Sequence, residues 1–360
     1  MKLLRVGPVG VLVGLLVVAG CTASPPPGGA PESTRVVSSA PATTPSAPTT
    51  TAPVSPSTTT PAGPENPTAD PADQVPLQAL MAVDYDGRDL RLGREGGSTN
   101  AYRQYFATYE GGGLTISGRI NVPRGRGPFP AVVLAHGYVD PDEYANGETM
   151  LRERDYLARQ GYVTLHIDYR NHAQSDDDPD NDVNLRLGYT EDAINAALAL
   201  QKHPLVDPDR IALIGRSMGG GVVYNALVVK PRLFKAAVAY SPVSSDSVDN
   251  FNHFIRRNAA RSDLVSRIIS VLGEPSAEPE RWAQTSPRTF FDRIAAPIMI
   301  HHGTRDESCP ISWSEETVAA LKSEGKAVAY HVYEGERHTF TGQWPLSIRR
   351  TAAFLDRYLG

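Results

Sequence analysis

The segment that most constrains the fold of this chain is residues 211–221, Ile-Ala-Leu-Ile-Gly-Arg-Ser-Met-Gly-Gly-Gly. Its first four residues are apolar and predict a buried parallel strand. Gly215-Arg216-Ser217-Met218-Gly219 follows at once and fits the pattern G-x-S-x-G. Apolar residues then recur at helical spacing, at Val222, Val223, Ala226 and Leu227. Strand, tight turn and helix in this order are the context of a nucleophile elbow, which exposes its serine at the edge of a sheet.

The two glycines that flank Ser217 have a physical reason in such a turn. The serine backbone is strained there, and the helix packs so close to the strand that side chains would clash. The helix N-terminus adds partial positive charge near the serine and near any oxyanion that the serine generates. A Gly-rich turn with a non-catalytic serine would match the same short motif, so other parts of the chain must decide whether Ser217 is a nucleophile.

Net charge and cysteine content exclude some classes of protein. The chain has 360 residues, a formal net charge of −5 and no basic block, which argues against a nucleic-acid partner. Its two cysteines are Cys21 and Cys309, and Cys21 lies in a targeting segment, so we expect no disulfide in the mature domain. We interpret Cys309, beside Pro310, as a small side chain in a loop rather than as a catalytic thiol.

The N-terminus predicts export and lipid anchoring. Residues 1–20 read as a secretory signal, with Lys2 and Arg5 before an apolar run over 9–18 that is too short to span a bilayer comfortably. Val18-Ala19-Gly20-Cys21 resembles the lipobox of bacterial lipoproteins. The resemblance implies cleavage before Cys21, lipidation of that residue and an extracytoplasmic position on the cell membrane. An ordinary secretory signal with a chance cysteine, and hence a secreted protein, is the alternative.

Residues 21–76 are predicted to be a disordered tether, and residues 77–360 the folded domain. Fourteen of the 30 prolines fall in residues 22–76, and Ser, Thr and Ala fill most of the other positions. Such a stretch buries too little apolar surface to offset the entropy cost of ordering. The composition is compatible with O-glycosylation of the Ser/Thr tract but does not by itself establish it.

Two hydrophobic patterns follow one another in the domain. Residues 101–110 and 114–122 predict strands joined at a Gly-Gly-Gly hairpin. Strands and helices then alternate, with further strands predicted over 131–135, 162–168, 211–214, 236–240, 297–301 and 327–333. Helices are predicted over 147–160 and 188–202, directly after Ser217, from 313 to 321, and over 345–358. This alternation predicts an α/β fold, with a mainly parallel sheet covered on both faces and an active site at the carboxyl ends of its strands.

Residues 242–292 break this alternation, because a plain crossover between two strands needs far fewer residues. Leu264, Val265, Ile268, Ile269 and Leu272 form an amphipathic pattern that Gly273 terminates, and the aromatic residues before it suggest a second helix. We interpret the segment as a helical lid over the serine, because it follows a strand whose carboxyl end faces the site. The alternative is an insertion that packs at the edge of the sheet and has no role at the active site.

A serine hydroxyl needs a base to take its proton, and the base needs a third group to orient it. His338 follows the last predicted strand, where α/β-hydrolases carry their base, and Asp306 follows strand 297–301. Ser217, Asp306 and His338 stand in the chain order of that fold. A surface histidine and a turn-capping aspartate are the alternatives for the two partners.

Two backbone N–H groups are candidates for an oxyanion hole. His136-Gly137-Tyr138 follows strand 131–135, where such folds place one donor, and the residue after the nucleophile supplies the other. We therefore assign the N–H groups of Tyr138 and Met218. We interpret His136 as a structural hydrogen-bonding residue that shapes the loop, rather than as a catalytic base.

Three separated motifs resemble the catalytic domain of the prolyl oligopeptidase family of serine peptidases. They are Gly215-x-Ser217-x-Gly219-Gly220, His302-Gly303-Thr304-x-Asp306-x-x-x-Pro310 and Tyr333-x-Gly335-x-x-His338-x-Phe340. The resemblance covers residues 115–360 and implies an α/β-hydrolase fold, acylation of Ser217 and hydrolysis of the acyl-enzyme by water. Only about 40 folded residues are predicted before it, which leaves no room for the N-terminal β-propeller of the large members. The resemblance therefore leaves the substrate range open, since single-domain relatives include esterases.

No cofactor or metal is predicted. The acidic run 175–182 lacks the glycine and terminal glutamate of a calcium loop and is interrupted by Pro179, so a solvated loop is the simpler interpretation. Adjacent His301 and His302 on a strand point to opposite faces and do not share a metal. Neither H-E-x-x-H nor G-x-G-x-x-G occurs.

Three functions remain from the sequence. The first is a membrane-anchored serine peptidase that acts on small peptides, and the second is an esterase that uses the same triad on small acyl esters. The third is a non-catalytic binding protein of the cell envelope, against which the complete triad and oxyanion loop argue.

Overall fold

The structure is a computed structural model that describes residues 76–360. The predicted signal peptide, Cys21 and the predicted tether up to residue 75 lie outside the described residues. Within residues 76–360, no helix combines the length and the apolar character that crossing a lipid bilayer requires.

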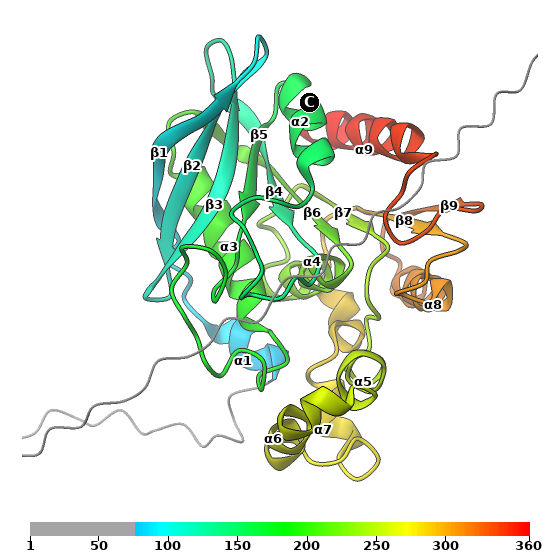
Figure 1. Cartoon of the computed structure of the whole chain (residues 1–360). Helices are drawn as coiled ribbons and strands as arrows, with labels where there is room; N and C mark the ends of the chain where they lie inside the picture. The colour runs from blue at the N-terminus through cyan, green and yellow to red at the C-terminus, as the bar shows by residue number, and fades with distance from the viewer. Residues whose placement is uncertain (1–75) are drawn as a thin grey trace, which may run out of the picture. The chain divides into compact units, whose positions relative to one another are not determined.

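A nine-stranded sheet forms the centre of the described chain, in the order β1-β2-β3-β5-β4-β6-β7-β8-β9 (Figure 1). The strands are β1 (Arg88–Ser98), β2 (Tyr102–Gly111), β3 (Leu114–Pro123), β4 (Phe129–Ala135), β5 (Val163–Ile167), β6 (Val206–Arg216), β7 (Ala236–Tyr240), β8 (Ile298–Gly303) and β9 (Val328–Tyr333). The pairs β1–β2, β2–β3 and β3–β5 are antiparallel, and all pairs from β5 through β4 to β9 are parallel. The predicted mainly parallel sheet is therefore confirmed.

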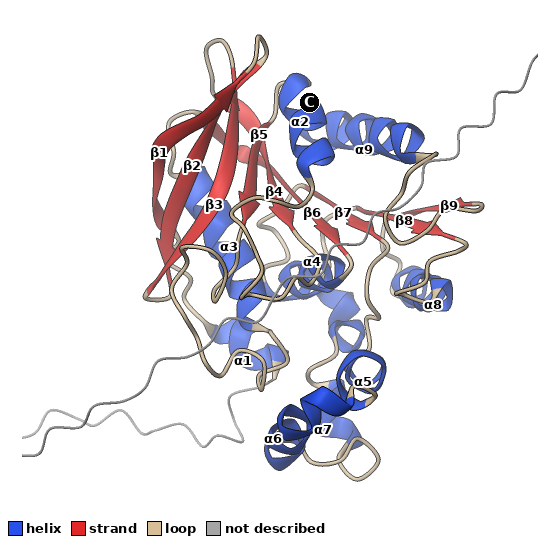
Figure 2. Ribbon diagram, in the orientation of Figure 1, coloured by secondary structure: helices blue, strands red, loops and turns tan. Residues whose placement is uncertain are grey.

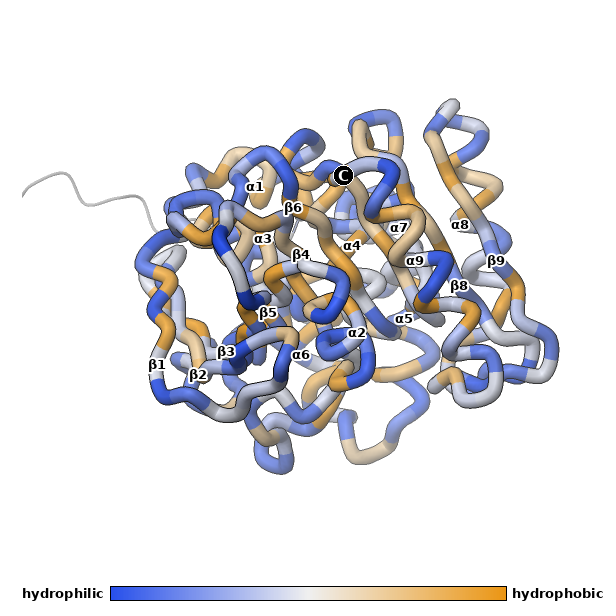
Figure 3. Tube along the Cα trace, turned by 90° about the horizontal axis from the view of Figure 1, so that it is seen from above, coloured by the Kyte–Doolittle hydropathy of each residue, from blue (hydrophilic) through white to orange (hydrophobic). Residues whose placement is uncertain are grey.

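Helices cover both faces of the sheet (Figure 2). The longer ones outside residues 242–292 are α2 (Leu151–Arg159), α3 (Gly188–Gln201), α4 (Met218–Val229), α8 (Ile311–Ser323) and α9 (Trp344–Leu359). Alternate residues of β4 point into two separate cores: Val132 and Leu134 join the core beneath α2 and α9, and Val133 joins the core beneath α3 and α4. Both faces of the central strands are apolar for this reason. Figure 3 shows hydrophobic residues, in orange, mostly along the inner segments and hydrophilic residues, in blue, mostly in the outer loops.

Strand β1 is a feature that the sequence pattern did not predict. It carries five charged residues and three glycines among its eleven positions, and most of its residues are exposed. It pairs only with β2 and forms the edge of the sheet. Only its first half alternates, with Leu90 buried and Leu92 packed against the core, and the exposed second half has no buried face to impose a hydrophobic alternation. Short helix α1 (Leu77–Ala82) precedes it and buries Leu77.

Residues 242–292 fold as a helical insertion between β7 and β8. Its elements are α5 (Ser247–Asn250), the π-helix η2 (Phe251–Arg256), the 3-10 helix η3 (Ala259–Arg261), α6 (Ser262–Leu272), α7 (Pro279–Ala283) and the 3-10 helix η4 (Pro287–Arg293). The predicted amphipathic helix is α6, which buries Ile268 and Leu272 and ends at Gly273, whose φ is 76°. Trp282 is fully buried, and its indole N–H donates to the Gly273 carbonyl at 3.0 Å. Figure 1 shows α5, α6 and α7 grouped below the sheet.

Candidate active site

Ser217 lies on a strained turn between β6 and α4. Its φ is 56° and its ψ −119°, a backbone conformation that non-glycine residues rarely adopt. Three backbone hydrogen bonds hold it there: Ser217 N–H donates to the Tyr240 carbonyl at 2.9 Å, and the Ser217 carbonyl accepts from Gly220 at 2.8 Å and Val243 at 3.1 Å. This is the geometry that the G-x-S-x-G motif predicts.

The two glycines of the motif allow strand and helix to approach closely. A Cβ atom added to Gly215 would lie 1.9 Å from the Gly219 carbonyl oxygen. A Cβ atom added to Gly219 would lie 2.0 Å from the Ala135 carbonyl oxygen, at the end of β4. Both neighbours are backbone atoms, so neither position accommodates a side chain without moving a strand or the helix.

Asp306 and His338 are directly paired. They follow β8 and β9, and His338 Nδ1 lies 2.9 Å from both carboxylate oxygens of Asp306. The aspartate side chain is 1% exposed and also accepts from the backbone N–H groups of Ser308 at 2.9 Å and Cys309 at 2.8 Å. Burial alone would raise the pKa of Asp306, but these hydrogen bonds, with one from His302, outweigh it and hold the pKa well below its ordinary range. The carboxylate is therefore ionised and oriented toward the imidazole.

His302 is a neighbour of Asp306 that the sequence analysis did not assign to the site. Its Nε2 lies 3.2 Å from Asp306 Oδ2 and 3.0 Å from the Cys309 carbonyl oxygen, and its Nδ1 is 2.7 Å from the Ser314 hydroxyl. In the tautomer that carries its proton on Nε2, His302 accepts from the Ser314 hydroxyl and directs Nε2–H between the Asp306 and Cys309 oxygens. The signal available in the sequence was that His302 begins the motif that contains Asp306, four residues before it.

Cys309 is part of the support of Asp306. It is fully buried, and burial together with the Asp306 carboxylate raises the pKa of its thiol well above the ordinary value. The thiol is therefore protonated, which agrees with its interpretation as a structural side chain.

Ser217 and His338 face a common cavity. The lining of this cavity includes Gly137, Tyr138, Ser217 and His338, together with residues at the start of α2. In the described part of the chain, no hydrogen bond joins the Ser217 hydroxyl to the His338 imidazole. Catalytic hydrogen bonds are often long without substrate, and serine and histidine at one cavity is the arrangement that proton transfer requires.

The predicted oxyanion-hole residues flank Ser217. A Cβ atom added to Gly137 would lie 3.1 Å from Ser217 Cβ and 3.7 Å from Ser217 Oγ, so the backbone before Tyr138 runs beside the serine. Met218 is the first residue of α4, where N–H groups have no intrahelical acceptor. The fold thus brings both candidate donors next to the serine, and their role in binding an oxyanion stays a prediction.

His136 anchors the loop that carries Tyr138. It is fully buried, with Nδ1 2.6 Å from the Gly137 carbonyl oxygen and Nε2 3.2 Å from the Asp168 carbonyl oxygen. Its ring stacks on Tyr144 with centroids 4.8 Å apart. Burial lowers the pKa of His136 to about 4, so the ring is neutral and donates to one of the two carbonyls. This position fits the structural role expected of it.

A second cavity lies on the insertion side of Ser217. Ser217, Met218 and Val222 of the elbow and α4 form one wall, and η2 forms another with Phe251, Phe254 and Ile255. Tyr138 lines this cavity as well as the one at His338. The insertion therefore builds part of the wall beside the candidate nucleophile, as the lid interpretation requires, and its movement stays a prediction.

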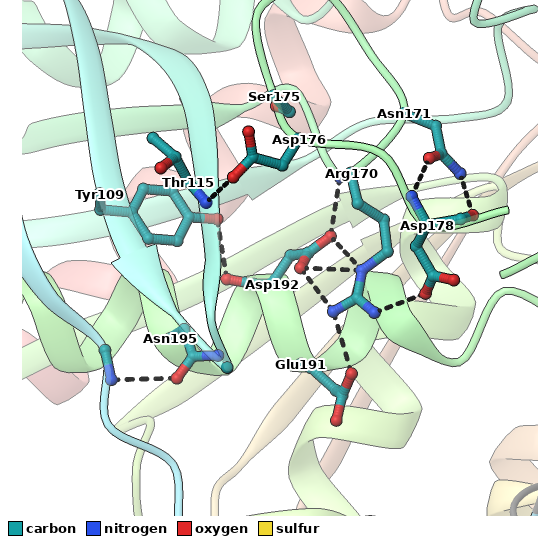
Figure 4. Close-up of polar contacts among 12 residues, drawn as sticks. Tyr109, Thr115, Arg170, Asn171, Ser175, Asp176, Asp178, Glu191, Asp192 and Asn195 are labelled. Carbon is teal, nitrogen blue, oxygen red and sulfur yellow. Dashed lines mark hydrogen bonds and ion pairs between the residues drawn. The ribbon is translucent and has the colours of Figure 1, made fainter. Parts of the chain in front are cut away.

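The acidic segment 175–182 is tied to the fold by arginine and backbone groups (Figure 4). The Arg170 guanidinium contacts Asp178 at 3.0 Å, Glu191 at 2.9 Å and Asp192 at 2.8 Å, which joins the loop after β5 to α3. Asp176 accepts from the Thr115 N–H at 2.7 Å. Among residues 76–360, no group of three or more His, Cys, Asp or Glu side chains is arranged to hold a metal ion.

Comparison with known proteins agrees with this geometry. A family model described as "Prolyl oligopeptidase family" matches residues 148–360, more than half of the chain. The uncharacterized peptidase YuxL of Bacillus subtilis is 26% identical over 269 residues, which are 71% of this chain and 38% of YuxL. The uncharacterized peptidase YtmA of the same organism is 26% identical over 257 residues, which are 71% of this chain and 93% of YtmA. The chain thus spans well under half of the first relative and nearly all of the second.

A solved structure supports the fold independently. Acetyl xylan esterase 1 from Thermoanaerobacterium sp. superposes with a TM-score of 0.58 at 20% identity, over 78% of this chain and 92% of that chain. At this identity the likeness concerns the fold, and it agrees with the predicted α/β-hydrolase architecture. With the family match over residues 148–360 and with peptidases among its relatives, the chain belongs to the prolyl oligopeptidase family and is a serine hydrolase.

Proposed function

We propose that this chain is a membrane-anchored, extracytoplasmic serine peptidase that hydrolyses peptide or amide bonds of small peptides with the triad Ser217, His338 and Asp306. The observation that carries the proposal is the hydrogen-bonded pair of His338 and buried Asp306, which opens on the cavity of Ser217. The strained backbone of Ser217 adds to it, because strain of this kind concentrates at functional sites.

The proposed mechanism assigns one step to each group. The His338 Nε2 takes the proton of Ser217 as the serine oxygen attacks the substrate carbonyl, and Asp306 holds the ring in the required tautomer through Nδ1. The N–H groups of Tyr138 and Met218 bind the oxyanion of the tetrahedral intermediate. His338 then protonates the leaving amine, and a water molecule hydrolyses the acyl-enzyme by the same steps.

Esterase activity on small acyl esters is the second candidate. Two of the relatives named above are peptidases, which favours peptide substrates. The acetyl xylan esterase is covered over 92% of its length, so its size matches the described domain closely. Both reactions use the same triad, and they differ in the leaving group and in the shape of the pocket.

Covalent labelling tests the triad. The full chain should react with a fluorophosphonate probe, and Ser217→Ala should remove the label, whereas Ser266→Ala on the exposed face of α6 should keep it. Parallel rate measurements on aminoacyl and prolyl amides and on short-chain esters then decide between the two substrate classes. A wild-type protein that folds but stays unlabelled would contradict the proposed triad and would favour an envelope binding role.

We also propose that Cys21 carries a lipid anchor. The proposal rests on the lipobox-like sequence before Cys21 and on the proline-rich segment that follows it. A flexible segment of that length separates its ends by about 40 Å on average, too far for the lipid to contact Ser217. Cys21→Ser should therefore move the protein from the membrane fraction to the soluble fraction without changing its specific activity.

The two other results of this fractionation are informative. A Cys21→Ser protein that stays with the membrane would show that another part of the chain binds lipid. A released protein of much lower specific activity would indicate that the membrane takes part in substrate capture, which would favour an amphiphilic ester over a soluble peptide.

A further inference from the structure

Arg261 is a cationic side chain of the insertion that forms no ion pair with a carboxylate. It ends η3, is partly buried and lines the cavity that contains Ser217 and Met218. Within residues 76–360, no carboxylate lies within 4.0 Å of its guanidinium group, and no side-chain or backbone oxygen accepts a hydrogen bond from it. Guanidinium groups removed from bulk water normally find such partners.

The other two charged residues of this cavity neutralise each other. Arg186 Nε donates to Asp182 Oδ1 at 2.7 Å, and Arg186 Nη2 lies 3.4 Å from Asp182 Oδ2. Both oxygens of the single carboxylate in the cavity wall are therefore engaged by Arg186. With two guanidinium groups and one carboxylate in its wall, the cavity beside the candidate nucleophile carries a net positive charge. Burial raises the pKa of Asp182, and Arg186 and, from beyond ion-pair distance, Arg261 lower it below its ordinary value.

Tyr138 holds the Arg261 guanidinium near the reaction site. The Arg261 guanidinium carbon lies 5.1 Å from the Tyr138 ring centroid, and that of Arg186 lies 4.3 Å from it. Tyr138 directly follows Gly137, whose added Cβ would be 3.1 Å from Ser217 Cβ. A guanidinium stacked on an aromatic ring keeps its N–H donors free along its edge, where they match the two oxygens of a carboxylate.

We propose that Arg261 is a specificity-determining residue that binds a carboxylate group of the substrate in the cavity beside Ser217. The inference rests on the serine-hydrolase site proposed above and deepens it, because it names the substrate class as anionic peptides or esters. Such a carboxylate has two sources. It is either the free C-terminus of a peptide, on the leaving-group side, or an acid group on the acyl side.

Two matched substrate pairs distinguish these sources in the full chain. For the leaving-group side, an internally quenched peptide with a free C-terminus is compared with the same peptide as its C-terminal amide. For the acyl side, succinyl-alanine p-nitroanilide is compared with acetyl-alanine p-nitroanilide. We expect the wild-type kcat/KM to favour the carboxylate member of one pair by about tenfold or more, since charge-assisted hydrogen bonds are of that strength.

Three variants assign this preference to Arg261. Arg261→Met should bring the ratio within the preferred pair close to one, and Arg261→Lys should keep part of it, because lysine retains the charge and loses the planar fork. Arg257→Met is the matched control: Arg257 is exposed, belongs to the same insertion and does not line the cavity, so its removal should leave the ratio unchanged. Thermal unfolding of each variant verifies that the fold is intact.

The outcomes separate this inference from the proposed function. A wild-type protein that labels with fluorophosphonate and hydrolyses the neutral substrates, but prefers neither carboxylate member, would overturn the role of Arg261 and leave the triad intact. An unchanged ratio in Arg261→Met, or an equal loss in Arg257→Met, would also overturn it. A protein without labelling or hydrolysis would overturn the proposed triad and this inference together.

Discussion

The loops that carry Asp306 and His338 differ sharply in construction from the helical insertion on the other side of Ser217. The Asp306 side chain is 1% exposed and lies within hydrogen-bonding distance of His338, His302 and two backbone N–H groups. In the insertion, α6 buries only two of its eleven residues, and its ion pair with the acidic loop, Arg267 to Asp180 at 3.3 Å, has both side chains more than half exposed.

This difference separates the chemistry from the choice of substrate. Removing one partner from a buried hydrogen-bond network leaves the others unsatisfied, whereas an exposed ion pair is replaced by water at little cost. Buried contacts at the end of the sheet therefore hold the reacting groups, and a segment whose outer helix is largely exposed shapes the cavity that the substrate enters. Variants on the two sides of Ser217 are expected to differ accordingly.

The largest expected effect is that of His338→Ala. Without its base, Ser217 cannot be activated, so kcat/KM should fall by about 10³-fold or more. The unfolding midpoint should also fall, because the buried Asp306 carboxylate loses its His338 partner. The matched control is His331→Ala, since His331 lies on edge strand β9, away from the cavity of Ser217. Steady-state kinetics and thermal unfolding measure both quantities, and a loss below tenfold would contradict the assignment of the base.

Asp306→Asn is expected to rank next. The amide cannot hold the histidine tautomer that leaves Nε2 free to accept a proton, so we expect a loss of kcat of about 10²- to 10⁴-fold. Glu307→Gln is the matched control, because Glu307 is exposed, accepts from the His338 backbone N–H at 3.2 Å and pairs with exposed Arg337 rather than with the His338 ring. If Glu307→Gln were the more damaging change, the third member of the triad would be misassigned.

Acid should destabilise the folded domain through His136, a buried residue that follows β4. Its pKa is about 4 in the folded state and 6.5 when unperturbed, so the unfolded chain binds more protons between these values. The stabilisation is complete above pH 6.5 and is lost as the pH falls toward 4, by about 3 kcal/mol for this group. Urea unfolding across this range should show that decline, and His136→Asn should make it shallower, since burial also lowers the pKa of His166 and His301 and these groups contribute the rest. An equal slope in the variant would contradict the contribution of His136.

Arg267→Ala should have the smallest effect. Because both members of its ion pair are exposed, the free energy of unfolding should change by no more than about 0.5 kcal/mol. Urea titration of wild type and variant measures this difference. A loss above about 1.5 kcal/mol would show that the insertion is held as firmly as the loops of the sheet, and the contrast between the two regions would not stand.

Much of the fold was predictable because the central strands are buried on both faces. Their apolar runs, such as Ile211–Ile214, follow directly from that burial, and each is bounded by polar or glycine-rich turns. The edge strand β1 was not predicted because most of its residues are exposed to solvent and packing against the core does not constrain their hydrophobicity. The hairpin of β2 and β3 was predictable from its turn glycines, two of which have positive φ angles.

For the site, the sequence by itself determined the candidates Ser217, Asp306 and His338, because each follows a predicted strand and parallel strands end at one edge of a sheet. Only the tertiary structure decided which other groups meet them. His302 contacts Asp306 because the loop after β8 folds back on the end of that strand. Arg261 contacts Tyr138, which is more than a hundred residues away in the sequence. The positions of the strands along the chain follow from local periodicity, whereas the order of the strands in the sheet and these contacts depend on tertiary packing, for which the sequence carries no periodic signal.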